Sequence, residues 1–129
     1  PANQAQGAFD IQLQVGVRTP RMAQAGQGDA TICRTSYRHA YWTIAQLVTH
    51  HTVNGCNLQP GDLLGTGTLS GPTATEAGAL VELTSGGKQP VTLPSGETRS
   101  FLEDGDSVAP GRARIGFGTC EGTVLAAVV

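Results

Sequence analysis

Glu82 is the residue whose surroundings in this sequence say most about chemistry. It lies in the run ALVELTS, residues 79–85, where an acid has apolar neighbours on both sides. The run predicts a strand in which Leu80, Glu82 and Thr84 share one face. The acid can lie on a solvated outer face, or it can be a partly desolvated carboxylate whose pKa is raised or which a histidine partner holds ionised. The pattern alone favours the solvated face and leaves the second interpretation open.

A glycine-rich stretch precedes this run. Residues 60–71 read PGDLLGTGTLSG and superficially resemble a dinucleotide-binding loop. A phosphate loop needs a helix directly after its glycines, but a polar run without helical periodicity follows Pro72. Ser70 occupies the third glycine position, and no lysine stands where a Walker motif needs one. Nucleotide binding is therefore disfavoured, and either a structural bulge or a close approach of ligand to backbone stays open.

The histidines, cysteines and remaining acids form no recognisable metal or nucleophile motif. No C-x-x-C occurs, and the other spacings fit no zinc pattern. The sequence LEDGD, residues 102–106, lacks the EF-hand spacing and predicts a tight turn. G-x-S-x-G is absent, so a serine triad has no support. Structural or surface roles are favoured for the residues considered as ligands: Cys33, His39, His50, His51 and Cys56.

Short strands separated by turns must position these residues. Residues 9–17 alternate apolar and polar side chains and predict a half-buried strand. Residues 18–29, rich in Pro, Gly and polar side chains, predict a loop. The pattern indicates a mainly β fold, as a sandwich, barrel or roll with one inserted helix. Further strands are expected at residues 31–36, 63–69, 79–85, 89–94, 98–103, 113–118 and 123–129.

The single expected helix spans residues 43–53. Thr43 and Gln46 have the T-x-x-Q spacing of a capping box. The pair Asn54-Gly55 marks the end, because glycine readily adopts the left-handed conformation of a helix C-terminus. One face of this helix carries residues at the spacing of an amphipathic helix: Ile44, Leu47, Val48 and His51.

Composition narrows the class of protein. The 129 residues fit one domain, and 8 basic against 10 acidic residues disfavour a nucleic-acid binder. No apolar run is long enough to cross a membrane, and no secretory signal pattern is visible at the N-terminus. Three cysteines without framework spacing favour a reducing cytosol. The start at Pro1, without methionine, is consistent with a piece of a longer protein.

Four stretches of the chain form a wider pattern: YWTIAQLVTHHTVNGCNLQPGDLLGTGTLSG, ALVEL, TRSFLEDGDSV and RIGFGTCEGTVL. Together they closely resemble the C-terminal part of enzymes of the fumarylacetoacetate hydrolase family. The first stretch is the most specific, whereas the PGD, GT and SG core and FLEDGD recur throughout the superfamily. The resemblance implies that residues 1–129 are a C-terminal segment of the catalytic domain, part of a mixed β-roll, with the upstream metal-binding part absent.

The resemblance also implies roles for two residues. By position, Thr68 matches the family's substrate-contacting threonine and Glu82 the glutamate that orients its catalytic histidine. The implied reaction is hydrolysis of a carbon–carbon bond in a β-diketone, giving fumarate and acetoacetate from fumarylacetoacetate in tyrosine and phenylalanine catabolism. Mg²⁺ or Ca²⁺ would be bound by acids outside this chain, which contains no E-x-E pair. The isolated chain is therefore expected to be inactive.

The implied enzyme takes a small β-diketo acid, forms a homodimer and is cytoplasmic. The alternative enzyme is a related acylpyruvate hydrolase or decarboxylase, against which the stretch HHTVNGCNL argues. An alternative from another class is a non-catalytic β-rich module that uses the glycine-rich stretch for binding or assembly.

Overall fold

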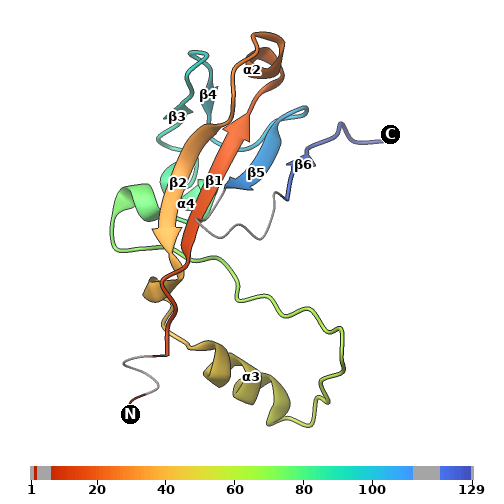
Figure 1. Cartoon of the computed structure of the whole chain (residues 1–129). Coiled ribbons are helices and arrows are strands. Elements are labelled where there is room, and N and C mark those ends of the chain that lie inside the picture. Colours follow the sequence, from red (N-terminus) through yellow and green to blue (C-terminus); the bar gives the residue numbers. More distant parts are fainter. Residues whose placement is uncertain (1, 3–6, 112–119, 129) are drawn as a thin grey trace.

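Four antiparallel strands form the main sheet of the chain (Figure 1). The computed structural model describes residue 2, residues 7–111 and residues 120–128. The strands lie in the order β2-β1-β5-β6, so β1 is central and β2 forms one edge. The expected strands at 9–17 and 31–36 are confirmed, although the first begins at Gln12. The bounds are β1 Gln12–Arg18, β2 Ala30–Ser36, β5 Ser107–Gly111 and β6 Gly122–Thr123.

A β-bulge interrupts the pairing of β1 with β2. The pairing with β2 shifts register between Val15 and Gly16. A Cβ on Gly16 would stand 2.9 Å from the Cβ of Asp29, so glycine allows this close approach. Val17, beyond the bulge, is buried in the core, whereas Leu13 and Val15 before it line a pocket described below. Since side chains alternate along a strand, Leu13, Val15 and Val17 share one face of β1, which thus serves the pocket at one end and the core at the other.

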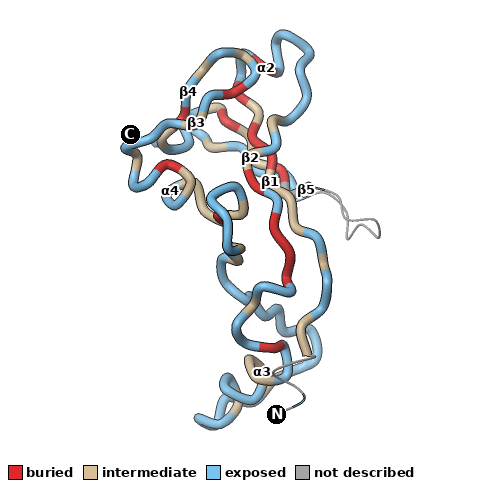
Figure 2. The backbone as a smooth tube through the Cα atoms, turned by 90° about the vertical axis from the view of Figure 1, so that its left-hand side faces the viewer, coloured by how far each residue is buried: buried red, intermediate tan, exposed pale blue. Residues whose placement is uncertain are grey.

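The hydrophobic core lies under the end of β1 that is far from the N-terminus. Its buried members are Val17, Met22 and Leu93. Figure 2 shows buried positions along β1 and β2. Met22 belongs to α2, Pro20–Gln24, whose N-cap Thr19 accepts a hydrogen bond of 3.1 Å from the Met22 amide. The prediction of an uninterrupted loop over residues 18–29 was therefore wrong, because Thr19 and Pro20 supply a cap and a first-turn proline. A second sheet, β3 Val91–Thr92 paired with β4 Thr98–Arg99, covers the core and carries part of two expected strands.

Helix α3, Ile44–Thr52, confirms the expected helix and its cap. The Thr43 hydroxyl accepts from the Gln46 amide at 3.3 Å, and the Gln46 side chain accepts from the Thr43 amide at 2.9 Å. The helix lies at the tip of an arm, residues 40–64, that projects away from the sheet (Figure 1). Every side chain of α3 is at least partly exposed. Within the described part of the chain, this helix is therefore stabilised by its capping box rather than by packing.

Replacing Thr43 by Ala should loosen α3. The loss of an N-cap hydroxyl costs about 1 kcal/mol, so amide hydrogen exchange in α3 should accelerate about fivefold. Hydrogen exchange measured by mass spectrometry on peptides from the arm and from β1 tests this. Thr49→Ala is the matched control, since its hydroxyl bonds the helix interior at Ala45 O and caps nothing. Equal exchange in the Thr43 variant and the unchanged protein would contradict the assigned cap.

The predicted turn at LEDGD is confirmed and encloses a buried ion pair. The Asp106 amide donates to the Glu103 carbonyl at 3.0 Å, and Gly105 has φ +88°. The Arg99 guanidinium donates two hydrogen bonds to the fully buried Asp106 carboxylate, of 2.7 and 3.1 Å. Burial by itself raises the pKa of Asp106, but the bonds from Arg99 and the Glu103 amide, with the Arg99 charge, lower it overall. This part of the family motif is thus structural.

Apart from the run around Glu82, three strand predictions require correction or fall outside the described residues. Residues 62–71, which include the expected strand 63–69, form neither helix nor strand in the described structure. The expected strand 123–129 is reduced to β6 and an irregular continuation through residue 128, and the strand expected at 113–118 lies outside the described residues.

The run that carries Glu82 is a helical turn rather than a strand. Helix α4 spans Leu80–Leu83, and the Ala79 carbonyl accepts from the Glu82 and Leu83 amides, both at 3.1 Å. The run is short, and its apolar residues fit a helical turn as well as a strand. Ser85, at φ +50°, and the two glycines after it end the turn. With α2 and α4, the chain contains more than the one helix expected; the mainly β class is confirmed, and the roll stays a prediction.

Candidate functional site

The glycine-rich segment, residues 65–71, meets α4 through one short hydrogen bond. The Ser70 hydroxyl donates to the Glu82 carboxylate at 2.5 Å. The Gly78 amide donates in turn to the Ser70 oxygen at 3.1 Å. These bonds bring together the two stretches that the sequence singled out, although Ser70 and Glu82 are twelve positions apart in the sequence. Ser70 and Gly78 carried no predicted role, because their contact depends on how residues 72–79 fold back.

Close backbone approach explains why residue 78 is glycine. A Cβ at Gly78 would stand 2.2 Å from the Leu69 carbonyl oxygen and 2.9 Å from the Thr68 side chain. Gly71 is fixed in a similar way: its amide donates to the Glu76 carbonyl at 2.9 Å, and a Cβ there would stand 2.7 Å from the Glu76 side chain. The glycine-rich segment is therefore held against residues 76–78 by contacts that exclude any side chain.

Replacing Gly78 by Ala should displace this segment. The new methyl group meets backbone, which cannot swing away, so we expect a loss of stability of about 1–3 kcal/mol and disruption of the Ser70–Glu82 contact. Urea unfolding of the intact protein measures the loss. Gly65→Ala is the matched control in the same segment, because its Cβ would meet nothing within 4 Å. Equal unfolding midpoints for the two variants would show that Leu69 does not lie against Gly78.

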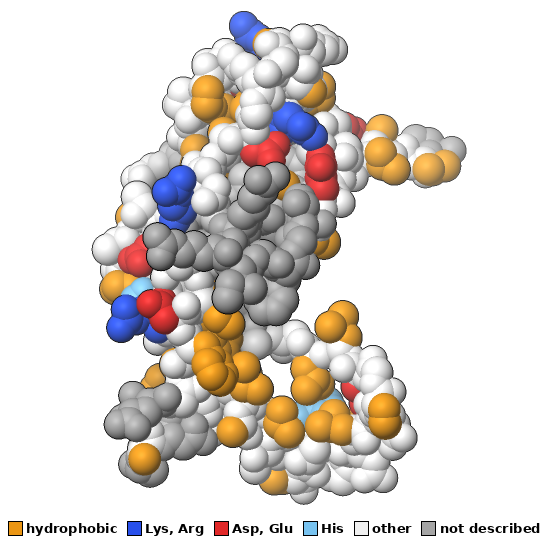
Figure 3. Space-filling model, viewed as in Figure 1, with side chains coloured by type: hydrophobic (Ala, Val, Ile, Leu, Met, Phe, Trp, Pro, Cys, Tyr) orange, Lys and Arg blue, Asp and Glu red, His pale blue; other side chains and the backbone are white. Residues whose placement is uncertain are grey.

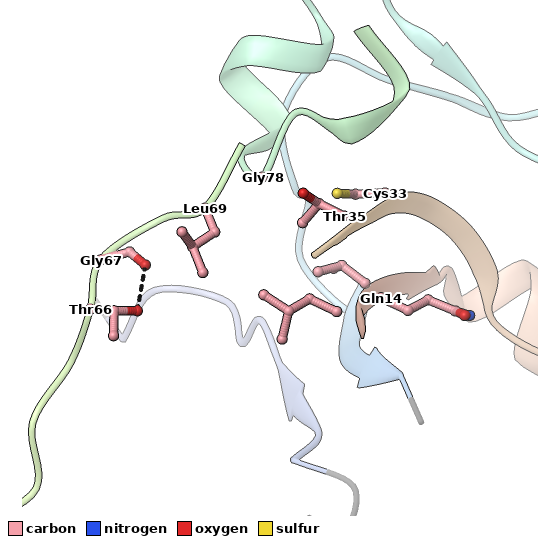
Figure 4. Close-up of a pocket in the computed structure, with 9 residues that line it drawn as sticks. Gln14, Cys33, Thr35, Thr66, Gly67, Leu69 and Gly78 are labelled. Carbon is pink, nitrogen blue, oxygen red and sulfur yellow. Dashed lines mark hydrogen bonds between the residues drawn. The ribbon is translucent and has the colours of Figure 1, made fainter. Parts of the chain in front are cut away.

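A mainly apolar pocket of about 220 Å³ lies between the glycine-rich segment and the main sheet. Figure 4 shows Thr66, Gly67 and Leu69 on one side and Thr35 and Cys33, from β2, on the other. The remaining lining residues are Leu13, Gln14 and Val15, from β1, and Gly78.

The Thr35 hydroxyl is the polar group of this pocket that stands out. Thr35 is 5% exposed, and its hydroxyl oxygen has no hydrogen-bond partner among the described residues. A buried hydroxyl without a partner costs free energy, so it is available to a group that fills the pocket. The Gln14 amide, in contrast, points away (Figure 4) and donates to the Thr31 hydroxyl at 2.7 Å.

Charge around the pocket is negative. Burial raises the pKa of the Cys33 thiol, and the nearby charges of Glu76 and Glu82 raise it further. The thiol therefore stays protonated at neutral pH and forms part of the pocket wall. The pKa of Glu76 is lowered, chiefly by the hydrogen bond from the Thr73 hydroxyl. Burial opposes this effect, whereas the Thr73 amide and His39 lower the pKa further. His39 Nε2 lies 3.4 Å from Glu76 Oε1 and links this loop to the end of β2.

The two residues assigned by resemblance lie on neighbouring segments. Thr68 is exposed and does not line the 220 Å³ pocket, although its neighbours Gly67 and Leu69 do. Gly67 has φ +79°, which interrupts the extended backbone just before Thr68. Glu82 is exposed on α4, so the described residues do not desolvate its carboxylate. Both side chains can therefore be reached by a group that the described structure does not contain.

The histidine and cysteine side chains are dispersed. His51 Nε2 lies 3.2 Å from the Cys56 sulfur at the tip of the arm, remote in sequence from Glu82. Among residues 2, 7–111 and 120–128, no three or more His, Cys, Asp or Glu side chains form a group that could hold a metal ion. In the same part of the chain, no helix is long and apolar enough to span a membrane.

Comparison with known proteins shows the family to which the chain belongs. The family described as fumarylacetoacetate (FAA) hydrolase C-terminal matches residues 3–125. The chain belongs to the fumarylacetoacetate hydrolase family. This confirms the family resemblance of the sequence and places Thr68, Ser70, Gly78 and Glu82 within the matched region.

Relatives within this family share close to half of their residues with the chain. Fumarylacetoacetase of Homo sapiens is 48% identical over 127 residues, which cover 94% of the chain but 29% of the human protein. Fumarylacetoacetase of Bos taurus is 50% identical over 126 residues, which cover 93% of the chain and 29% of the bovine protein. The Dictyostelium discoideum fumarylacetoacetase is 43% identical over 132 aligned positions, which cover 96% of the chain and 30% of that protein. The chain thus spans less than a third of the length of these relatives.

Proposed function

We propose that this chain is the C-terminal part of an enzyme that hydrolyses a carbon–carbon bond in fumarylacetoacetate. The observation that carries the proposal is the Ser70–Glu82 hydrogen bond of 2.5 Å, which joins two motif segments within the matched region. The relatives described above are all named fumarylacetoacetase, which supports this substrate over other β-diketo acids. The products are fumarate and acetoacetate, at the end of tyrosine and phenylalanine catabolism.

In the proposed mechanism, Glu82 acts through a histidine from the rest of the intact protein. A carboxylate that accepts a hydrogen bond from one imidazole nitrogen keeps the proton on that nitrogen. The second ring nitrogen is then unprotonated and can accept a proton. That nitrogen removes a proton from water, and the water oxygen bonds to a carbonyl carbon of the diketone. The adjacent carbon–carbon bond then breaks, and its electron pair passes to the leaving enolate, which is protonated.

Thr68 is the proposed substrate contact. Its exposed hydroxyl follows the positive-φ Gly67, on a segment where backbone and small side chains leave room for a flat, carboxylate-bearing molecule. A hydroxyl can donate one hydrogen bond to such a carboxylate or to a carbonyl oxygen. In the proposed enzyme, Mg²⁺ or Ca²⁺ is held by acids outside this chain, and the roles of Thr68 and Glu82 do not depend on which ion is bound.

We propose further that the intact enzyme is a cytoplasmic homodimer. The arm exposes apolar side chains (Figure 3), including Trp42 at 55% and Leu63 at 97%, and exposed apolar patches of this kind are typical of interfaces. We propose that a second copy of the protein covers these apolar side chains of the arm. The free thiols of Cys33, Cys56 and Cys120 support a reducing compartment.

A substrate panel tests the proposed reaction. The intact protein with Mg²⁺ should split fumarylacetoacetate far faster than an acylpyruvate, and should release no carbon dioxide from a β-keto acid. Faster release of pyruvate from the acylpyruvate would favour the related hydrolase, and carbon dioxide release would favour the decarboxylase. The absence of turnover with any of the three would favour the binding or assembly module.

A further inference from the structure

We propose that Ser70 is a positioning residue that holds the Glu82 carboxylate in one orientation for the histidine it serves. This inference rests on the proposed function, because it gives Glu82 the role stated there. Its physical basis is the chain of two hydrogen bonds from the Gly78 amide to the Ser70 oxygen and from the Ser70 hydroxyl to Glu82 Oε2.

The first bond fixes the direction of the second. A serine hydroxyl has one proton to donate and two lone pairs that accept. The Gly78 amide occupies a lone pair of the Ser70 oxygen at 3.1 Å, and the carboxylate 2.5 Å away takes the proton. Hydrogen bonds to ionised acceptors are about twice as strong as neutral ones. Ser70 is therefore a donor to Glu82 rather than a second acceptor.

The backbone around Ser70 is held from both sides. The amide of the next residue, Gly71, donates to the Glu76 carbonyl at 2.9 Å. On the other side, the Leu69 carbonyl lies so close to Gly78 that a Cβ there would stand 2.2 Å from it. The serine oxygen is thus positioned by main-chain contacts and does not depend on a flexible side chain.

Glu82 needs such a contact because its own element is short. Helix α4 is a single turn of 4 residues, and the Glu82 side chain is exposed. A free glutamate there would exchange among rotamers, and ordering a long side chain costs conformational entropy. Ser70 binds Oε2, and Oε1 accepts no hydrogen bond from the other described residues. The arrangement leaves Oε1 for the imidazole.

Ser70→Ala in the intact protein tests this inference. We expect kcat on fumarylacetoacetate to fall about tenfold to a hundredfold, as for loss of a hydrogen bond to a charged group, with KM changed less than twofold. Ser70→Thr, which keeps the hydroxyl, should retain most of the activity. Ser95→Ala is the matched control: its hydroxyl donates to Glu97 at 2.6 Å in the β3–β4 turn, and its loss should leave kcat unchanged.

A double-mutant cycle separates positioning from a structural role. In a Glu82→Ala background, Ser70→Ala should have no further effect on kcat. An equal loss in both backgrounds, or unchanged kcat for Ser70→Ala alone, would overturn the inference while leaving the role of Glu82 intact. Unchanged kcat for Glu82→Ala would overturn both. If the alanine variant fails to fold, Ser70→Cys replaces it, since a thiol is a weak donor of similar size, and the same loss of kcat is expected.

Discussion

Replacing Glu82 by Gln in the intact protein should lower kcat on fumarylacetoacetate by roughly 10²-fold or more, the scale of disabled general-base catalysis. Gln keeps the size of the side chain and can still accept the Ser70 hydrogen bond, so the packing around α4 should persist. It cannot supply the negative charge that stabilises an imidazolium, and it can favour the wrong tautomer. The loss should therefore appear in kcat rather than in the unfolding midpoint, and steady-state kinetics with a urea titration measures both.

Glu103→Gln is the control for this experiment. Glu103 is an exposed acid outside the proposed site, and its carboxylate lies 3.3 Å from the Arg99 guanidinium. The Glu103→Gln variant should have a kcat within twofold of the unchanged protein. A Glu82→Gln enzyme with the kcat of the Glu103→Gln enzyme would remove Glu82 from the mechanism, and with it the proposed role of Ser70.

Replacing Asp106 by Asn should destabilise the intact protein by about 3 kcal/mol at neutral pH. Removing one member of a buried ion pair typically costs 3–5 kcal/mol, because the other charge stays buried. Arg99 keeps weaker contacts with Glu97, at 3.6 Å, and with Glu103, which places the expected loss at the low end of that range. Urea unfolding of the domain that contains β4 and β5 measures the change. Asp104→Asn, an exposed residue of the same turn, should change stability by less than 0.5 kcal/mol, as is usual at the surface.

The same pair gives stability a defined dependence on pH. The folded pKa of Asp106 lies below its ordinary value of 3.8. Its contribution to stability is therefore fully present above the unfolded pKa and is lost as pH falls through the folded pKa. The difference in unfolding free energy between the unchanged protein and Asp106→Asn should stay constant from pH 7 to about pH 5 and narrow below about pH 4. A difference that widens in acid would contradict the assigned ion pair.

The sequence predicted elements whose signals are local and strong. The alternation in β1 and the Thr43/Gln46 capping box of α3 each specify their structure within a few residues, and both are confirmed. Short runs were misleading: the residues around Glu82 fit either a strand or a helical turn, and local backbone hydrogen bonds from Ala79 favour the turn. Residues 63–69 are β-like in composition, but contact with Gly78 replaces strand pairing.

The candidate site was predictable in its residues but not in its geometry. Glu82 and the glycine-rich stretch stood out because an acid among apolar residues and clustered glycines are unusual. The Ser70–Glu82 bond could not be predicted, since it depends on the path of residues 72–79 between them. The buried Thr35 hydroxyl gave no signal either, because an isolated threonine in a strand is ordinary.

The proposed active site is divided between this chain and the rest of the intact protein. To test this division, the isolated 129-residue chain and the intact protein are given the same fumarylacetoacetate and Mg²⁺, and fumarate and acetoacetate are measured. We expect the intact protein to release the two products in equal amounts and the isolated chain to match the rate of a blank. Turnover by the isolated chain well above the blank, or no products from the intact protein, would contradict the claim.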